Sequence, residues 1–250
     1  MTDAILLDLS GVLYDGDVLI PGALEAVRRL QGSGLALRFI TNTSQKTRRD
    51  LLAHLHRLGF EVEDNQLFTA VDAACNWLRQ RDLRPYCLVH ENTVSEFAQF
   101  DQSDPNAVLV TDAAEGFTYA RLNRAFQLCL EGAPLLGVGY NRYFKSGDQV
   151  LMDAGAFIRA IEFAADIEAV IVGKPNSEFF RQVLASAGTA PESALMVGDD
   201  VFGDVAGALD AGIPACLVRT GKYRPGDENS VEGEFALVDS IVEAAELALG

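Results

Sequence analysis

Polar side chains that can handle a phosphate group recur along the chain, each directly after a short apolar run. Asp8 follows Ile5–Leu7 and precedes a Ser10-Gly11 turn, so its carboxylate is placed to act as a nucleophile. The later positions of this kind are Thr41-Asn42, Lys174 and Asp199-Asp200, with Asp204 one helical turn further on. Carboxylates suit Mg²⁺, and lysine and hydroxyl groups suit phosphate oxygens. Together these residues predict a phosphate-and-magnesium site.

The apolar runs before these residues predict strands that are buried on both faces. Three of them are Leu35–Ile40, Val170–Gly173 and Ala194–Val197, and helical periodicity follows each. Continuous apolar runs of this length are typical of parallel sheets, and strand–helix alternation predicts a doubly wound α/β fold. Because ligands bind at the carboxyl ends of strands in such folds, we expect the polar residues to converge at one sheet edge.

Four helices are expected in the parts of the chain that carry these motifs. Apolar spacing predicts one over 22–31, and a second from an N-cap near Ser44 to a stop at Gly59. A third begins with Pro175 and ends at Gly188, and a fourth covers about 238–249. These helices would cover the faces of the predicted parallel sheet.

The stretch between Thr41 and Lys174 is long enough to hold a second folding unit. Candidate strands there are Tyr86–His90, Ala107–Thr111 and Leu135–Val138, with helices near 72–80 and 119–131. This βα pattern can bury its own core, so we expect an α/β cap domain over 70–168, inserted into a catalytic core of 1–69 and 169–250.

Composition limits the partners of the chain. A formal net charge of −16 over 250 residues repels nucleic acid and anionic membranes. It would also repel an anionic phosphoester, so the small phosphorylated substrate that the motifs predict as the partner needs local cations such as Lys174 and a bound metal. No run approaches the roughly 18 apolar residues of a membrane span. The four scattered cysteines favour a reducing cytoplasm over a disulfide or zinc framework. A homodimer is compatible with this sequence.

The motifs together resemble those of the haloacid dehalogenase superfamily of phosphotransferases. They are Asp8-Leu9-Ser10-Gly11-Val12, Thr41-Asn42, Gly173-Lys174-Pro175, and Gly198-Asp199-Asp200 with Asp204. The insert resembles the α/β cap of the branch that contains 4-nitrophenylphosphatases and nucleotidase-like enzymes. Runs such as Arg219-Thr220-Gly221-Lys222-Tyr223-Arg224 resemble the phospholysine phosphohistidine inorganic pyrophosphate phosphatase subfamily most closely. The resemblance implies a hydrolase with a Rossmann-like core.

Asp8 and Asp199 are the expected protein carboxylates of the Mg²⁺ site, with the backbone carbonyl of Ser10 as a third ligand. One phosphate oxygen and two waters would complete the shell of about six oxygen ligands that Mg²⁺ prefers. We expect Asp200 and Asp204 to hold those waters or to orient the lysine of the site.

Lys174, Thr41 and Asn42 are the expected phosphate-binding residues. Lys174 can bridge the phosphate and Asp8, which cancels the repulsion between an anionic nucleophile and an anionic substrate. The Thr41 hydroxyl and the Asn42 N–H can donate to a phosphate oxygen at a helix N-terminus. Asp8 would then attack phosphorus and form an aspartyl-phosphate, which water cleaves.

Ser10 departs from the superfamily pattern, in which phosphatases usually carry a second aspartate at this catalytic position. A hydroxyl has no useful acidity near neutral pH, so Ser10 cannot supply the usual acid–base help of about 10²–10⁴-fold. Either Asp15, Asp200 or a residue of the cap supplies it instead, or the substrate does not need it. Pyrophosphate and P–N phosphoramidates need little such help, so Ser10 favours them over alkyl esters. Two alternatives stay open: transfer of the phosphoryl group to an acceptor other than water, and a phosphate-binding or regulatory module with weak or no turnover.

Overall fold

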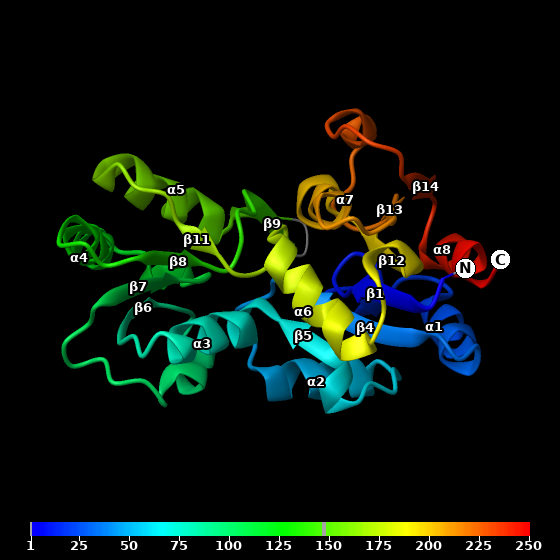
Figure 1. The fold of residues 1–250 in the computed structure, drawn as a ribbon, viewed down its shortest axis with the longest axis horizontal. Helices are drawn as coiled ribbons and strands as arrows, with labels where there is room; N and C mark the ends of the chain where they lie inside the picture. The colour runs from blue at the N-terminus through cyan, green and yellow to red at the C-terminus, as the bar shows by residue number, and fades with distance from the viewer. Residues whose placement is uncertain (1, 147–148) are drawn as a thin grey trace. The chain divides into compact units, whose positions relative to one another are not determined.

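The computed structural model describes residues 2–146 and 149–250, and the chain divides into two compact units (Figure 1). The first unit comprises Met1–Thr41, Leu52–Phe68 and Lys174–Gly250. The second comprises Asn42–Leu51 and Thr69–Gly173. The sequence placed the domain limits at 70 and 168, and did not separate the short segment 42–51 from the core.

The first unit is built on a six-stranded sheet in the order β14-β13-β12-β1-β4-β5. The strands are β1 (Ala4–Asp8), β4 (Ala36–Thr41), β5 (Leu67–Thr69), β12 (Ala194–Gly198), β13 (Ala215–Val218) and β14 (Ala236–Val238). β1 pairs in parallel with both β4 and β12. The chain runs outward from β1 in one direction and then from β12 in the other. A reversal of this kind is where ligands bind in doubly wound folds.

Helices cover this sheet because its central strands have no polar face. Every residue of β1 and β12 is buried, as the continuous apolar runs predict. α1 packs against α8, and α6 packs against β4 and α7 (Figure 1). The helices with residues in this unit are α1 (Ala23–Gly32), α2 (Arg48–Arg57), α6 (Ser177–Ala187), α7 (Gly207–Asp210) and α8 (Ile241–Leu249). A short hairpin, β2 (Tyr14–Asp15) with β3 (Val18–Leu19), follows β1.

The second unit has its own parallel sheet in the order β11-β8-β7-β6. Its elements are β6 (Pro85–Leu88), β7 (Ala107–Val110), β8 (Leu135–Gly137), β11 (Val170–Ile171), α3 (Ala70–Gln80), α4 (Tyr119–Leu130) and α5 (Ala154–Ala165). Side chains alternate along β7, so Val108 packs with residues of α4 and α5, and Leu109 packs with residues of α3. In Figure 1, α4 and α5 lie on one side of this sheet and α3 on the other. The unit therefore has an apolar core on each face of its sheet.

Shorter elements complete the fold. An antiparallel hairpin in the second unit joins β9 (Tyr143–Ser146) to β10 (Gln149–Met152). The 3₁₀ turns are Asp64–Gln66, Glu91–Phe97, Ala114–Gly116, Pro191–Ser193 and Asp227–Asn229, and Val201–Ala206 is a π-helical turn. In the part of the chain that the structure describes, no helix has the length and apolar character needed to cross a membrane.

The segment 42–51 belongs to the second unit because its polar groups bond there. The Ser44 hydroxyl accepts the N–H of Asp112 at 3.0 Å, and the Ser44 carbonyl accepts the Thr93 hydroxyl at 3.1 Å. Arg48 forms an ion pair with Asp72 at 2.5 Å. The prediction that Ser44 caps the following helix is therefore wrong, since its side chain is engaged elsewhere.

Two helix starts differ from the sequence prediction. α2 begins at Arg48, and the Thr47 hydroxyl accepts the N–H of Asp50 at 3.1 Å, so Thr47 does the capping that was expected of Ser44. α6 begins at Ser177, where the Asn176 side chain accepts the N–H of Glu178, and not at Pro175. In both cases a side chain that can accept a hydrogen bond lies nearer the first turn than the predicted start.

Candidate active site

Asp8 and Thr41 end the two adjacent central strands of the first unit. Asp8 lies opposite Ile40 in the register of β1 and β4, so Thr41 follows one residue further along the neighbouring strand. Both side chains are nearly fully buried. The parallel register therefore places the predicted nucleophile and the predicted phosphate-binding hydroxyl at the same edge of the sheet.

Lys174 joins two carboxylates in the interior of this unit. Its Nζ donates to Asp8 Oδ1 at 2.5 Å and to Asp204 Oδ1 at 2.6 Å. The lysine is only 4% exposed, and Asp204 only 1%. A buried ammonium group is tolerated when carboxylates and hydrogen bonds compensate the loss of water, and here two carboxylates do so.

The Asp199-Asp200 pair follows β12, at the same edge of the sheet. Oxygen atoms of Asp8, Asp199 and Asp204 all lie within 4.8 Å of one another. Three carboxylates this close repel one another unless cations lie between them. Hard oxygen donors of this kind are the ligands that Mg²⁺ prefers, so the donor set fits this ion.

Asp200 has a different role from Asp199. Its Oδ1 accepts the N–H groups of Phe202 and Gly203 at 2.9 and 3.0 Å, which caps the π-helical turn. Its own N–H donates to Asp204 Oδ2 at 3.1 Å. Adjacent residues thus face different ways: Asp199 lies in the carboxylate cluster, while Asp200 holds the turn that carries Asp204.

Lys222 is a site residue to which the sequence analysis gave no role. Its Nζ lies 2.6 Å from Asp200 Oδ2, and its N–H donates to Asp199 Oδ2 at 2.8 Å. It follows β13, whose apolar run Ala215–Val218 ends at the same edge of the sheet. That run is the signal that could have located Lys222 from the sequence.

Two glycines make room for the Asp199 carboxylate. Gly11 has φ +85° and Gly221 has φ +68°, a conformation that side chains disfavour. A Cβ on either residue would also overlap Asp199 Oδ2. The Thr220 hydroxyl donates to the Gly11 carbonyl, which joins the two turns. The close approach of both backbones therefore requires glycine at both positions.

The charges of the site stabilise one another. Burial alone would lower the pKa of Lys174, but Asp204 and Asp8 outweigh it and hold that pKa above its usual value. Burial raises the pKa of Asp199 well above its ordinary value, and Lys222 opposes this. For Asp200 burial is outweighed by Lys222 and the capped N–H groups, so its pKa is lowered. A further cation near Asp199 would favour its ionised form.

Ser10 and Asn42 closely follow the strand ends that carry the site. Ser10 is exposed, and its backbone bridges to Tyr14 across the turn after β1. Asn42 is the first residue of the second unit by its contacts. Among the predicted site residues, those brought together by described contacts are Asp8, Lys174, Asp199, Asp200 and Asp204.

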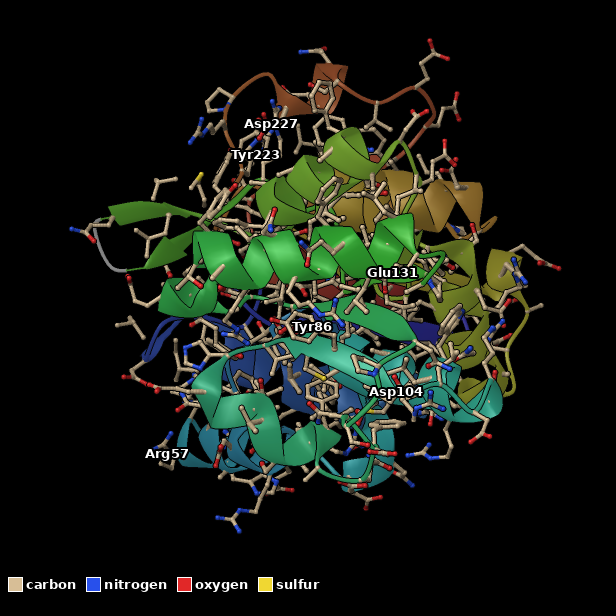
Figure 2. The ribbon with its side chains drawn as sticks, turned by 90° about the vertical axis from the view of Figure 1, so that its left-hand side faces the viewer. Arg57, Tyr86, Asp104, Glu131, Tyr223 and Asp227 are labelled. Carbon is tan, nitrogen blue, oxygen red and sulfur yellow. The ribbon has the colours of Figure 1, made fainter. Side chains whose placement is uncertain are left out.

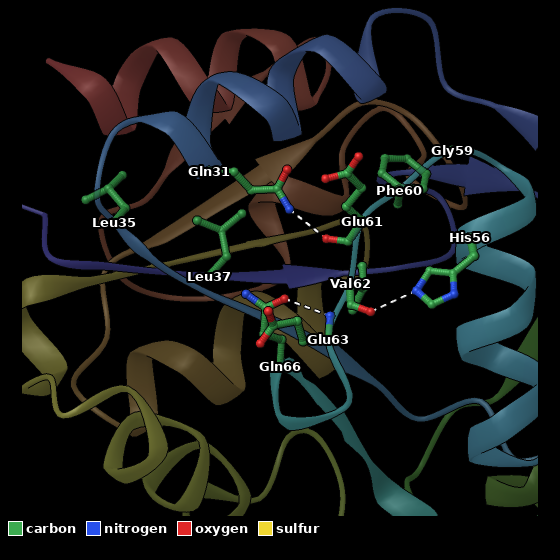
Figure 3. A pocket seen from close by; sticks show the side chains of 10 residues that line it. All are labelled: Gln31, Leu35, Leu37, His56, Gly59, Phe60, Glu61, Val62, Glu63 and Gln66. Atoms are coloured by element: carbon green, nitrogen blue, oxygen red, sulfur yellow. Dashed lines mark hydrogen bonds between the residues drawn. The ribbon is translucent and has the colours of Figure 1, made fainter.

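A separate pocket of about 710 Å³ opens near the start of β4 (Figure 3). Leu35 and Leu37 line it, so it lies at the other end of the strand from Thr41. Polar groups around it are already bonded: Gln31 donates to the Glu61 carbonyl at 2.7 Å, and His56 Nε2 lies 2.9 Å from the Val62 carbonyl (Figure 3). None of the predicted site residues lines this pocket.

Known proteins resemble this chain over almost its whole length. A family model described as Haloacid dehalogenase-like hydrolase matches residues 5–102, and one described as HAD-hydrolase-like matches residues 171–244. The chain is 46% identical to the phospholysine phosphohistidine inorganic pyrophosphate phosphatase of Rattus norvegicus, over 98% of this chain and 93% of the relative. For the human protein of that name the identity is 44%, with the same coverage.

Solved structures show the same fold. The 4-nitrophenylphosphatase of Thermotoga maritima superposes with a TM-score of 0.89 at 27% identity, over 98% of this chain and 97% of that one. NagD from E. coli has a TM-score of 0.84 at 24% identity, over 97% and 98% of the two chains, a likeness of fold alone. The doubly wound α/β fold is thus confirmed, and the chain belongs to the haloacid dehalogenase-like hydrolases.

Proposed function

We propose that this hydrolase is a Mg²⁺-dependent phosphatase that forms an aspartyl-phosphate on Asp8. The observation that carries the proposal is the buried Lys174 ammonium, which bonds Asp8 at 2.5 Å beside a cluster of carboxylates. An anionic nucleophile needs such a cation nearby to approach an anionic substrate. Asp8, Asp199 and the Ser10 carbonyl would hold the metal. When bound, Mg²⁺ supplies positive charge to the phosphate oxygens.

Asp8 would perform the covalent step. Its carboxylate oxygen forms a bond to phosphorus while the bond from phosphorus to the leaving group breaks, and the leaving group departs with that electron pair. Water then attacks the aspartyl-phosphate, which releases inorganic phosphate and restores the Asp8 carboxylate. Lys174 offsets the repulsion between the incoming phosphate and the nucleophile throughout, since it stays bonded to Asp204 at 2.6 Å.

The two units would have different roles in the reaction. In this proposal the first unit is the catalytic core, with Thr41 and the N–H of Asn42 donating to the transferred phosphate. The second unit is the cap that selects the substrate and shields the aspartyl-phosphate from premature hydrolysis. All four cysteines are free thiols, which supports a reducing cytoplasm as the location.

Ser10 points to the substrate class. Without a carboxylic acid at this position, leaving groups that need no proton from the enzyme are favoured, namely the phosphate expelled from pyrophosphate and the nitrogen of a phosphoramidate, which is already protonated when the P–N bond breaks. The relatives that are 44–46% identical carry names that include phospholysine, phosphohistidine and pyrophosphate, which supports the same class. Ser10 is also the observation that favours the rival hypothesis, a phosphate-binding module with little turnover.

A substrate panel tests the proposal. The purified chain is assayed with pyrophosphate, phospholysine, phosphohistidine, 4-nitrophenyl phosphate and simple sugar phosphates, each with and without Mg²⁺. We expect turnover of the P–O–P and P–N compounds only with Mg²⁺, and slower turnover of the sugar phosphates. Phosphate and Mg²⁺ binding without turnover of any compound would instead establish the binding module.

A further inference from the structure

Lys222 holds both members of the Asp199-Asp200 pair, each by a different atom. Its ammonium group lies 2.6 Å from Asp200 Oδ2, and its main-chain N–H donates to Asp199 Oδ2 at 2.8 Å. The lysine side chain is 26% exposed and that of Asp200 only 19%, so the ion pair is mostly removed from water. A shielded pair is screened much less by salt than one on the surface.

The loop that carries Lys222 is anchored on both sides of it. On one side the Thr220 hydroxyl bonds the Gly11 carbonyl, which ties the loop to the turn after Asp8. On the other side the Tyr223 hydroxyl donates to Glu228 at 2.9 Å, and the Arg224 N–H donates to Asp227; Figure 2 labels Tyr223 and Asp227 on this loop. These bonds fix the main chain from which the Lys222 side chain projects.

Asp200 borders the carboxylate cluster of Asp8, Asp199 and Asp204 without belonging to it. It is adjacent in sequence to Asp199, and its N–H contacts Asp204 at 3.1 Å. One of its oxygens is used by the N–H groups of Phe202 and Gly203. The other oxygen is the one that Lys222 occupies.

The charges of the described side chains in this cluster match one divalent cation. Four carboxylates, those of Asp8, Asp199, Asp200 and Asp204, face two ammonium groups, those of Lys174 and Lys222. The excess of two negative charges is the amount that Mg²⁺ carries. Loss of Lys222 would leave an excess of three negative charges.

We propose that Lys222 is a positioning residue that holds the Asp199-Asp200 pair and, by its charge, sets the affinity of the site for a divalent cation. The inference rests on the proposed Mg²⁺ dependence. It predicts that the cation is held less tightly than the carboxylates alone would hold it, because Lys222 repels it.

A charge-swap cycle tests this, with Mg²⁺ affinity measured by calorimetric titration of the substrate-free protein. Lys222→Met should bind Mg²⁺ about tenfold more tightly, because one repulsive charge is gone. Asp200→Asn should bind it about tenfold more weakly, because Lys222 is then unpaired, while the amide oxygen still caps the helix. The double variant should return to within about twofold of the wild type.

Activity and a conservative variant provide the second readout. Lys222→Met should have a lower kcat although it binds Mg²⁺ more tightly, because Asp200, whose N–H contacts Asp204, would lose the ammonium group that holds it. Lys222→Arg should restore both the Mg²⁺ affinity and most of kcat. A structural lysine would instead lower the melting temperature of Lys222→Met and leave its Mg²⁺ affinity unchanged or weaker, which overturns the inference.

The outcomes separate this inference from the proposed function. If the wild type binds no Mg²⁺ in the titration, the proposed metal dependence fails, and the inference fails with it. If the wild type binds Mg²⁺ but neither single variant shifts the affinity in the stated direction, only the role of Lys222 is overturned. Opposite shifts in the two single variants, cancelled in the double variant, support the role of Lys222.

Discussion

At the scale of the residue, the defining feature is one buried ammonium group shared by two carboxylates. Lys174 is bonded to Asp8 and Asp204, and all three are nearly inaccessible. Removing every partner of a buried charge is strongly destabilising, whereas removing one of two leaves it compensated. Asp8 can therefore be neutralised for a test of its chemistry while Lys174 keeps a partner.

Asp8→Asn should remove turnover and keep the fold. An amide oxygen is not a competent nucleophile toward phosphorus, so kcat should fall on the order of 10³-fold or more. Asp104→Asn is the matched control, since the Asp104 side chain is 90% exposed in the second unit. Steady-state kinetics and circular dichroism on both variants provide the measurement, and substantial turnover by Asp8→Asn would contradict the assignment.

Ser10→Asp should change the preference for the leaving group. A carboxylic acid at this position can protonate an alkoxide, so kcat/KM for alkyl phosphate esters should rise, by up to about 10²-fold. Pyrophosphate and phosphoramidates should gain far less. Both substrate classes are compared at saturating Mg²⁺, because the added charge can also alter metal affinity. An equal gain for the two classes would show that Ser10 does not govern leaving-group protonation.

At the scale of the element, the turns after β1 and β13 are built to approach one carboxylate. Gly11 and Gly221 both have positive φ, and both backbones pack against Asp199. Because the strands are parallel, these turns lie at the same sheet edge, where the N–H of Lys222 donates to the Asp199 carboxylate. The position of Asp199 is therefore fixed by main chain from two loops.

Gly221→Ala should damage the site more than its backbone strain explains. Gly226→Ala is the control, because Gly226 lies on the same loop with φ +102° but has open space around its Cα. Each change should cost roughly 1–2 kcal/mol of stability from the left-handed backbone. Only Gly221→Ala should also weaken Mg²⁺ binding and lower kcat, as measured by calorimetry and steady-state kinetics. Equal losses in both variants would contradict a role for this contact.

The sequence predicted the central strands well because they depend on local composition. β1 and β12 are continuous apolar runs, and such runs are buried on both faces almost wherever they occur in α/β folds. The charged residues after them could be placed at one edge because parallel strands share a direction. Family resemblance then gave the α/β fold and the hydrolase family, which the comparisons confirm.

The parts that the sequence did not predict depend on distant partners. Ser44 has the features of a helix cap, but it bonds Asp112, which is far away in the chain. Lys222 comes a few residues after the apolar run Ala215–Val218, but its contacts with Asp199 and Asp200 depend on how the intervening turn folds. Both outcomes arise where tertiary contacts override local preference.

At the scale of the whole molecule, a net charge of −16 opposes the binding of an anionic substrate. Lys174 and Lys222 are paired with carboxylates, so they do not reverse the sign of the charge around the site. A bound divalent cation would lower that repulsion where the phosphate must bind. The metal is therefore expected to stabilise the folded protein as well as to support turnover.

Mg²⁺ should raise the melting temperature, and chelation should abolish activity. At a Mg²⁺ concentration of about 100 times Kd, binding adds about 2.7 kcal/mol of stability, or roughly 5–10 °C. Asp199→Asn should lose most of this shift, whereas Asp64→Asn, outside the site, should keep it. Differential scanning fluorimetry measures the melting temperature. Activity is measured separately after treatment with EDTA and again after Mg²⁺ is added back. Full activity after exhaustive chelation would refute the metal dependence.

The division of the chain also governs how such a protein could exchange parts with its relatives. The chain passes between the units four times, after Thr41, Leu51, Phe68 and Gly173. The second unit is thus not one continuous segment of the chain, because the separate segment 42–51 also belongs to it. A recombination event that transferred only 69–173 would separate Ser44 from Asp112 and Arg48 from Asp72. Exchange of this unit as a whole would therefore require two gene fragments to be transferred together.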